Sequence, residues 1–579
     1  MQNWQVAAAL ERMAGLLALK GEKDFKVRAY SQAARQVIRT AEPLAALIEA
    51  GKLEQLPGIG PALARKITEL VKSGRSEFLA RLEAEVPSSL LALFSIPGVG
   101  YKTAATLVQK LQLQHLDQLE EAARAGRVAE LAGLGPRLEQ NIIHFFEQRR
   151  HRTEKFHRGV AVPLADQLTA YLLEHTAVAQ AGAAGELRRG VELVSEVVLV
   201  VALRRQADRS ALEKDLLRQP GLLEASPEEN GLAVRTVTGV PVRFSFTGEK
   251  EFPTALAAAT GSGEHWSRLV ALAREAGLKL DQEGLFGRHG RVLLFEEADL
   301  YAALGLPPIP PELREDGAEI GAAQEGRLPQ LIEADMIRGD LHLHSDWSDG
   351  VATIEAMAAT AEALGYEYAA ITDHSPSLQI AGGLSPERLR RQIAQIRSFN
   401  EKNPRCRLFS GIEVDIRPDG SLDLPDDLLD ELDVVVASVH SHFKQGCEEM
   451  TARICRAMEH PAVQIIGHPT GRLLGSRGGY QVDVERLIRQ AAATGTILEL
   501  NASPQRLDLP DIYLRRAREA GVLLTINTDA HSPVTMEDMS YGVTAARRGW
   551  LEGADVLNTL PRDRLEKMLK VKRRHGCKR

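Results

Sequence analysis

The feature that most constrains the fold of this chain is a regular alternation of short apolar segments with amphipathic helices beyond Ile337. Apolar runs bounded by turn residues are typical of buried strands, and apolar residues at i, i+3 and i+4 are typical of helices. Their alternation predicts a β/α barrel, whose chemistry lies on loops at the C-terminal ends of the strands. The expected strands include residues 369–372, 434–438, 464–467, 497–500 and 523–527.

Imidazoles and carboxylates stand at the ends of these expected strands. His342 and His344 are two residues apart, as are Asp529 and His531. Strand residues at this spacing point to the same side, and His with Asp or Glu suits Zn, Mn and Fe. A lone histidine would more often be an ordinary buried or solvated residue, but chance would not place a whole set at strand ends. We therefore predict a cluster of divalent metal ions held by His342, His344, Asp349, His374, Glu413, His440, His468, Asp529 and His531.

Residues 1–150 are helical by pattern and contain an internal repeat with a period of about 40 residues. Each repeat has an apolar-Gly-apolar-Gly turn followed by a helix with a cation, such as Lys66, Lys102 or Arg137. Such a turn lets backbone amides at a helix N-terminus approach a phosphate. The alternative is three tight turns without a ligand, but the repetition favours contact with the DNA backbone. The glycines expected to bind DNA are Gly58, Gly60, Gly98, Gly100, Gly133 and Gly135.

The chain has 579 residues, which is too long for one core. Mixed strands and helices follow residue 155, and a Pro-rich stretch at 306–311 leads into a Gly/Ala/Glu segment that is expected to be a linker. The segments expected from these changes are 1–80, 81–154, 155–235, 236–312, 313–336 and 337–579.

Bulk properties exclude several classes of protein. The longest apolar stretch is far shorter than the roughly 20 residues that span a bilayer, so no membrane partner and a cytoplasmic location are expected. Cys406, Cys447, Cys455 and Cys577 match neither a disulfide framework nor a zinc knuckle. A net charge of -7 argues against a protein that is basic all over, although local contact with DNA remains compatible with it. No obligate protein partner is expected.

The three turns resemble the helix-hairpin-helix motif, and the metal ligands resemble, position by position, those of the polymerase and histidinol phosphatase (PHP) family. The resemblance implies three divalent ions (Mn, Zn, Fe or Mg). The first would be held by His342, His344, Glu413 and Asp529, the second by Glu413, His440 and His468, and the third by Asp349, His374 and His531. Such ions activate water and neutralise a phosphate. Arg472 would be a catalytic phosphate clamp, with an exposed structural arginine as the alternative.

The helix-hairpin-helix repeats near the N-terminus are followed by the PHP-like ligands in the C-terminal part. This order resembles that of a bacterial family X DNA polymerase over nearly the whole chain. This resemblance implies an all-α helix-hairpin-helix N-terminal region, an α/β nucleotidyltransferase-like palm and thumb, and a distorted (β/α)7 PHP barrel. It also implies that the six expected segments are, in order, a lyase-like helical domain, a fingers-like domain, a palm, a palm end with a thumb, a linker and a metallo-phosphoesterase domain. In relatives with lyase activity, the residue matching Lys66 forms a Schiff base with an abasic sugar, while those matching Lys26 and Tyr30 help to hold the phosphate. That task requires a desolvated lysine of lowered pKa.

The palm departs from the family pattern. The family has Gly-Ser-x-Arg-Arg-Gly and then Asp-x-Asp on a strand, with a third aspartate on the following strand. Here Glu186 replaces the serine and Arg189 is kept, while the aspartate positions hold Glu196, Val198 and Arg243. Two-metal phosphoryl transfer needs carboxylates at these positions, and a valine binds no metal. We predict an inactive polymerase site in which Arg243 takes the place of a cation and pairs with Glu196.

The leading hypothesis is a DNA-repair enzyme that binds gapped, nicked or 3′-ended DNA and acts as a metal-dependent 3′-5′ exonuclease or 3′-end-processing phosphoesterase. One alternative is an active gap-filling DNA polymerase that uses Glu196 and an unrecognised carboxylate. The others are a PHP phosphomonoesterase acting on a small substrate and a DNA-binding scaffold with structural metals.

Overall fold

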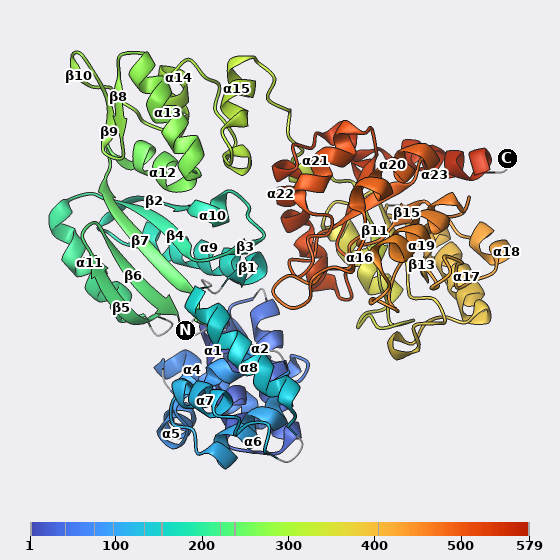
Figure 1. Cartoon of the computed structure of the whole chain (residues 1–579), viewed down its shortest axis with the longest axis horizontal. Helices are drawn as coiled ribbons and strands as arrows, with labels where there is room; N and C mark the ends of the chain where they lie inside the picture. The colour runs from blue at the N-terminus through green and yellow to red at the C-terminus, as the bar shows by residue number, and fades with distance from the viewer. Residues whose placement is uncertain are drawn as a thin grey trace. The chain divides into compact units, whose positions relative to one another are not determined.

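The computed structural model describes residues 3–40, 42–74, 76–96, 98–131, 134–151, 155–219, 222–236, 239–402 and 405–576 (Figure 1). The chain divides into two compact units. Unit 1 comprises residues 1–155, 167–181 and 195–248, and unit 2 comprises residues 156–166, 182–194 and 249–579. No helix among the described residues is both long and apolar enough to cross a membrane.

Unit 1 begins with a helical region whose core is built around one largely apolar helix, α1. The buried side chains of α1, among them Leu10, Met13 and Leu17, form the centre of a core that also includes Ile67 and Leu107. The helices and 3-10 turns of this region are α1 (Asn3–Leu19), α2 (Asp24–Arg39), α3 (Leu44–Glu49), η1 (Leu53–Gln55), α4 (Pro61–Ser73), α5 (Glu77–Glu85), η2 (Ser88–Ser95), α6 (Tyr101–Leu111), α7 (Leu116–Arg124) and α8 (Pro136–His151).

A five-stranded sheet of strand order β2-β4-β7-β6-β5 follows the helices. Strands β4 and β7 are parallel, whereas β7, β6 and β5 are antiparallel neighbours. Strand β4 is apolar throughout, as expected for a central strand. The elements around this sheet are α9 (Arg158–Glu174), β2 (Val178–Ala184), β4 (Val197–Leu203), η3 (Gln206–Asp208), α11 (Arg209–Leu217), β5 (Leu222–Glu228), β6 (Gly231–Thr236) and β7 (Pro241–Gly248).

Unit 2 contains a small thumb-like subdomain with its own apolar core. Unit 2 also includes segments from earlier in the chain. They are β1 (Phe156–His157) and β3 (Leu193–Val194), which pair antiparallel, and α10 (Gly185–Arg188). The thumb itself comprises α12 (Phe252–Thr260), α13 (Gly263–Glu275), β8 (Lys279–Asp281), β9 (Gly284–Gly287), β10 (Gly290–Arg291) and α14 (Glu297–Ala303).

The stretch 313–336, expected as a linker, contains η4 (Pro311–Leu313), α15 (Ala318–Gln324) and η5 (Ala334–Met336). Ile320 of α15 belongs to the thumb core. Glu319 is fully buried and lies 2.5 Å from the Nδ1 of His265, also buried. Part of this stretch is therefore packed structure of unit 2, and the finer domain boundaries remain predictions.

The rest of unit 2 is a nearly closed barrel of seven parallel strands in sequence order. A parallel bridge between Leu343 and Ala530 joins its first and last strands. The buried strand residues form two apolar clusters. Phe409 belongs to one cluster and Leu408, its neighbour on the same strand, belongs to the other, because adjacent strand residues face opposite sides. The strands are β11 (Gly339–Leu343), β12 (Tyr368–Ile371), β13 (Arg407–Asp415), β14 (Val434–Ser438), β15 (Ile465–Ile466), β16 (Ile497–Asn501) and β17 (Leu524–Asn527).

Helices follow most of the barrel strands, as the sequence pattern predicts. They are α16 (Ile354–Ala363), α17 (Pro386–Lys402), α18 (Asp426–Asp430), α19 (Cys447–Glu459), α20 (Val484–Thr494), α21 (Asp511–Glu519), α22 (Met539–Arg548) and α23 (Arg562–Gly576), with the 3-10 turns η6 (Gln379–Ala381), η7 (Pro533–Asp538), η8 (Gly553–Asp555) and η9 (Leu557–Thr559).

Candidate metal centre and nucleic-acid interface

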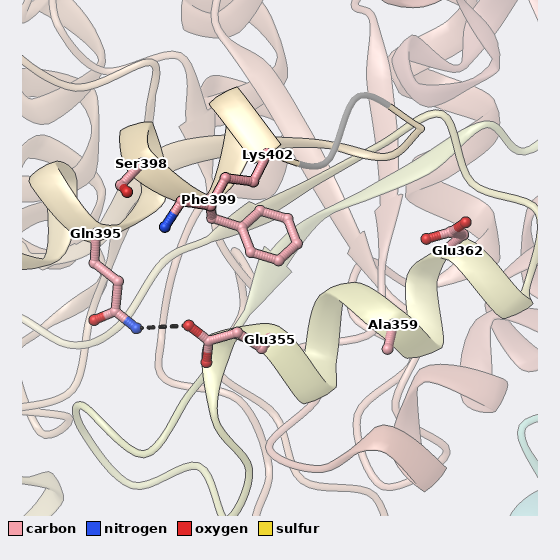
Figure 2. Close-up of a pocket in the computed structure, with 7 residues that line it drawn as sticks. All are labelled: Glu355, Ala359, Glu362, Gln395, Ser398, Phe399 and Lys402. Atoms are coloured by element: carbon pink, nitrogen blue, oxygen red, sulfur yellow. Dashed lines mark hydrogen bonds between the residues drawn. The ribbon is translucent and has the colours of Figure 1, made fainter.

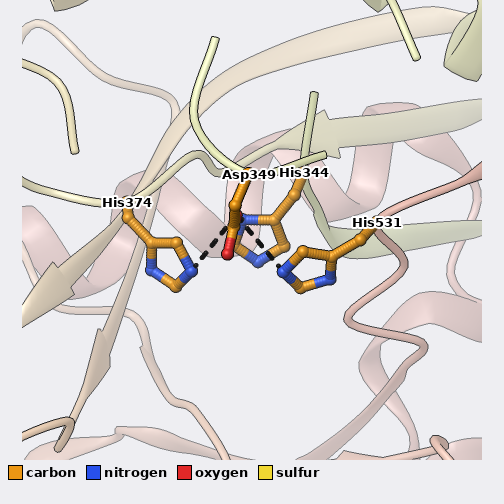
Figure 3. A group of neighbouring side chains, drawn as sticks. All are labelled: His344, Asp349, His374 and His531. Carbon is orange, nitrogen blue, oxygen red and sulfur yellow. Dashed lines mark ion pairs between the residues drawn. The ribbon is translucent and has the colours of Figure 1, made fainter. Parts of the chain in front are cut away.

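The C-terminal ends of the barrel strands bring the predicted ligands together. Figure 3 shows the Asp349 carboxylate between the rings of His374 and His531, with His344 beside it. Asp349 Oδ1 lies 3.5 Å from His374 Nε2, 3.3 Å from His531 Nε2 and 3.8 Å from His344 Nδ1. Asp349 and His531 are also the most exposed of the predicted ligands, so solvent reaches the centre from their side.

The Glu413 carboxylate on β13 lies at the middle of the cluster and is 1 % exposed. Each of its two oxygens faces several imidazoles. Oε2 lies 2.9 Å from His374 Nδ1, 3.5 Å from His342 Nε2 and 3.6 Å from His344 Nε2, and Oε1 lies 3.0 Å from His468 Nε2 and 3.3 Å from His440 Nε2. The two Glu413 oxygens thus face five imidazoles.

Asp529 provides the third carboxylate of the cluster. Its Oδ1 lies 3.1 Å from His344 Nε2 and 3.6 Å from His342 Nε2. Asp529 has a φ of 55° and His468 a φ of 27°, in the left-handed region that non-glycine residues seldom adopt. Such conformations cost about 1–3 kcal/mol each, and they persist where the surrounding structure imposes them, as at binding sites.

Buried polar atoms that lack a hydrogen-bond partner show whether these residues are suited to bind metal ions. Among the predicted ligands, the buried atoms with no hydrogen-bond partner in the described part of the chain are His342 Nε2, both ring nitrogens of His344, His374 Nδ1, His440 Nδ1, His468 Nδ1 and Glu413 Oε2. Leaving so many polar atoms unsatisfied is costly, and several of them point at one another across the cluster. Three clusters of histidines and acidic residues therefore suggest binding of divalent metals: His344, Asp349, His374 and His531; His342, His344 and Asp529; and His374, Glu413 and His440.

A second set of acidic residues orients the imidazoles. Glu499 Oε1 lies 2.7 Å from His342 Nδ1, so the opposite nitrogen of this ring is directed into the cluster. Glu499 Oε2 also accepts a hydrogen bond from the backbone N–H of His468. Asp415 lies 3.5 Å from His440 Nδ1. Neither Glu499 nor Asp415 was predicted from the sequence. A glutamate inside an apolar strand such as β16 nevertheless indicates a residue with a structural or functional partner, because glutamate is rarely buried without one.

The electrostatics of the cluster keep its carboxylates ionised. Burial alone would raise the pKa of Glu413, but the imidazoles of His440, His342 and His374 lower it well below its ordinary value. Burial would likewise raise the pKa of Asp529, and His342 and His344 lower it in the same way. Ionised carboxylates are the form that binds metals.

The helix-hairpin turns of unit 1 present helix N-termini without side-chain caps. Gly58 and Gly98 have φ values of 79° and 89°, where glycine avoids the strain that a Cβ would cause. Gly60 and Gly100 then cap α4 and α6, and neither helix has a side-chain cap. Uncapped first-turn amides can donate to a phosphate. Of the third turn, Gly135 precedes α8, whereas Gly133 lies outside the described residues.

In the palm-like sheet, a guanidinium occupies the place where the resemblance expects metal-binding aspartates. Val198 on β4 is in register with Arg243 on β7. Arg243 Nε lies 3.1 Å from Glu196 Oε2, and its Nη1 lies 2.5 Å from Glu228 Oε1. The predicted pairing of Arg243 with Glu196 is confirmed, and Glu228 is a second partner that the sequence did not reveal. Two carboxylates here neutralise an arginine.

Comparisons with known proteins agree with this arrangement. Family models match a helix-hairpin-helix domain at residues 1–76, a SAM-like helix-hairpin-helix tandem at 90–147, a DNA polymerase beta thumb at 255–315 and a PHP domain at 340–503. The chain is 37 % identical over 575 residues to the DNA polymerase/3′-5′ exonuclease PolX of Bacillus subtilis (strain 168). The alignment covers 98 % of this chain and 100 % of that protein. The chain belongs to the PolX family.

Shorter relatives match only a part of this PolX chain. A probable phosphatase of Syntrophotalea carbinolica is 36 % identical over 168 residues, which is 28 % of this chain and 65 % of that protein. A probable phosphatase of Thermoanaerobacter sp. (strain X514) is 28 % identical over 246 residues, or 41 % of this chain and 95 % of that protein. The helix-hairpin-helix domains and the likeness to polymerases imply that the PolX protein acts on DNA.

Arg472, the expected phosphate clamp, has its guanidinium engaged with protein groups. Its Nη2 lies 2.5 Å from Glu192 Oε1, and its Nη1 lies 3.1 Å from Glu192 Oε2. It also donates to the backbone carbonyls of Arg506 and Leu507.

Two other residues of the expected polymerase site also lie in unit 2. Arg189, kept from the nucleotide-binding pattern, pairs with Glu315 at 3.0 Å, and Glu186 lies on α10.

The residues expected for lyase chemistry lie together in the N-terminal region of the PolX protein. Lys66 Nζ lies 4.3 Å from the centre of the Phe78 ring, and Lys26 Nζ lies 5.9 Å from it. Tyr30 stacks on the same ring. Partial burial lowers the pKa of the Lys66 ammonium, and the charges of nearby cations such as Lys26 lower it further, although Glu69 opposes them.

A hollow on the barrel surface is separate from the metal ligands. It has a volume of about 570 Å³ and lies between α16 and α17, where Glu355 accepts a hydrogen bond from Gln395 (Figure 2). None of the predicted metal ligands lines it.

Proposed function

We propose that this PolX protein removes nucleotides from the 3′ end of DNA, or trims blocked 3′ ends, at its PHP centre, and that its polymerase site is silent. The observation that carries the proposal is the contrast between the two sites. The barrel directs unpartnered imidazoles and carboxylates at one another, while the palm directs a guanidinium at the carboxylates it retains.

At the PHP centre, divalent ions would supply an activated water and would neutralise the charge of the phosphate. The residues that would hold these ions are the nine predicted ligands, whose imidazoles gather around the Glu413 carboxylate. The exposed side, at Asp349 and His531, is where a DNA end would enter. The uncapped turns at Gly60 and Gly100 would hold the DNA backbone without reading its sequence.

The palm would bind DNA without joining nucleotides to it. Polymerisation requires carboxylates to hold two dications about 4 Å apart. Val198 offers no ligand, and Arg243 places a positive charge between Glu196 and Glu228. A dication would have to displace this arginine from both partners.

One gel tests both halves of the proposal. A 5′-labelled primer annealed to a template is incubated with the protein, Mn²⁺ and all four deoxynucleotides. Shorter products that disappear in the His344→Ala variant are expected. Longer products, abolished by Glu196→Gln, would show instead that the protein is an active polymerase.

The same preparation distinguishes a small-molecule phosphatase from a nuclease. If the protein leaves labelled DNA intact while it hydrolyses p-nitrophenyl phosphate, the DNA-trimming proposal is wrong and the alternative of a small substrate holds. Loss of all hydrolysis in His344→Ala, with DNA affinity unchanged, would exclude a scaffold with structural metals.

We propose lyase activity on abasic DNA as a second function, because Lys66, Lys26 and Tyr30 converge on the Phe78 ring. A lowered pKa leaves more of the Lys66 amine neutral at a given pH, and the neutral amine is the form that attacks the sugar aldehyde. Borohydride trapping on abasic DNA should therefore rise with pH to a midpoint below the ordinary lysine pKa.

The control for this experiment is Lys72 on the same helix, which is exposed. Trapping is expected to be lost in Lys66→Ala and kept in Lys72→Ala. Equal trapping by both variants would refute the assignment of Lys66 as the nucleophile.

A further inference from the structure

A second arginine lies at the edge of the metal centre. Arg506 Nε is 3.6 Å from Asp529 Oδ2, while Oδ1 of the same aspartate faces His344. The Arg506 side chain is 21 % exposed, and its guanidinium donates no hydrogen bond to any residue that the structure describes. Its terminal N–H groups are thus available next to a predicted metal ligand.

The loop that carries Arg506 is held in a conformation of its own. The backbone N–H groups of Arg506 and Leu507 both donate to the carbonyl of Ser503, at 2.8 and 2.9 Å. Leu507 has a φ of 41°, in the left-handed region. A residue in this region costs about 1–3 kcal/mol, so neighbouring contacts must hold the loop.

Arg472 supplies those contacts. Its Nε donates to the Arg506 carbonyl at 3.0 Å, and its Nη2 donates to the Leu507 carbonyl. The two η nitrogens also pair with Glu192, and the Arg472 side chain is only 13 % exposed. With both carbonyls and a carboxylate already engaged, Arg472 has little left to offer a phosphate.

A two-stranded element from earlier in the chain supports the same loop. Glu192 immediately precedes β3, which pairs with β1, and His157 on β1 lies 3.2 Å through its Nδ1 from the carbonyl of Pro504. Burial raises the pKa of Glu192, and the charge of Arg472 opposes this rise. This part of the polymerase-like region therefore braces the loop beside the metal centre.

We propose that Arg506 is the residue that binds the phosphate of the 3′-terminal nucleotide, and that Arg472, held by Glu192, is a positioning residue that acts through Arg506. This inference rests on the proposed 3′-trimming function and names the contact that the substrate makes. A guanidinium presents a planar set of N–H donors that matches two phosphate oxygens, and Asp529 holds the Arg506 guanidinium beside the residues that would hold the ions.

The first test replaces Arg506. In Arg506→Gln, the KM for 3′-ended DNA and the inhibition constant of dAMP should both rise about 10- to 100-fold, the range for loss of a hydrogen bond to a charged group. Arg506→Lys should recover part of this loss. Arg516→Gln, an equal charge change on the exposed side of α21, is the matched control and should behave as the wild type.

Two further readouts do not depend on turnover. Metal content should be equal in wild type and Arg506→Gln, and dAMP should raise the melting temperature of the Mn²⁺-loaded wild type but not that of the variant. Loss of metal in the variant, or unchanged dAMP binding, would overturn the proposal. A wild-type protein that trims no DNA would instead refute the proposed function.

The second test asks whether Arg472 acts through Arg506. Glu192→Gln and Arg472→Gln should each lower kcat/KM, but the double variant Arg472→Gln/Arg506→Gln should be no worse than Arg506→Gln alone, because residues that act as one unit are not additive. If the two losses multiply, Arg472 touches the substrate itself and its role as a positioning residue is wrong.

Discussion

Glu499 orients two of the predicted metal ligands, His342 and His468. One of its oxygens holds the Nδ1 side of His342, and the other receives the backbone N–H of His468. Asn527 donates to it as well, at 2.9 Å. A fully buried carboxylate with these partners fixes the orientation of two ligands at once.

Glu499→Gln should therefore weaken the site without removing a ligand. Loss of an outer partner of this kind lowers metal affinity or activity about 10- to 100-fold. Metal titration followed by 3′-trimming assays measures both quantities. Glu448→Gln, at a side chain that is 80 % exposed, is the control. Equal metal affinity in the two variants would show that Glu499 does not orient the ligands.

In the first helix-hairpin turn, the two glycines differ in backbone conformation but not in the space around them. Gly58 has a φ of 79° and Gly60 a φ of -85°, yet a Cβ at either position would meet no atom within 4 Å. Only Gly58 therefore needs glycine for its backbone conformation, while both positions leave room for a phosphate to approach.

Substituting each glycine by alanine tests this difference. Gly58→Ala should destabilise the N-terminal region by about 1–2 kcal/mol because of its left-handed backbone, whereas Gly60→Ala should change stability little. Both should weaken DNA binding, since each added methyl group obstructs the phosphate. Chemical unfolding and DNA binding at two salt concentrations measure these effects. Unchanged DNA affinity in both variants would exclude this turn from the DNA interface.

The barrel strands show how closely the local sequence pattern predicts where each strand begins and ends. The run at 434–438 coincides with β14, and the runs at 369–372, 497–500 and 523–527 overlap β12, β16 and β17 to within a residue or so at each end. The run at 464–467 shortens to β15, Ile465–Ile466, because His468 turns into the left-handed region directly after it. The predicted metal ligand His468 therefore lies just beyond the strand.

For the whole molecule, metal binding should contribute to the stability of unit 2. Ions that bind only the native state stabilise it by about 2.7 kcal/mol at a concentration 100 times their Kd. Removing them with a chelator should lower the melting temperature of the barrel by about 5–10 °C, as followed by calorimetry. His344→Ala should melt at the lower temperature with or without chelator. Identical melting of the wild type in both conditions would mean that the ligand cluster holds no stabilising metal.

The sequence by itself determined the barrel strands, the histidines and acidic residues that gather at their ends, and the repeated hairpin turns. Strand and helix periods depend on neighbouring residues, and ligand chemistry depends on residue type, so both can be read along the chain. The family resemblance predicts carboxylates where this sequence has Val198 and Arg243, and the pairing of Arg243 with Glu196 followed from opposite charge.

Only the tertiary structure decided which partners these side chains take. Arg472 looked like a phosphate clamp beside His468, but Glu192, 280 residues earlier in the chain, holds its guanidinium. Glu499 reaches His342 across 157 positions, and Arg506 reaches Asp529 from another loop. Local sequence cannot show these contacts, because an ion pair depends on distance in space, and barrel closure brings together residues whose order along the chain gives no sign of it.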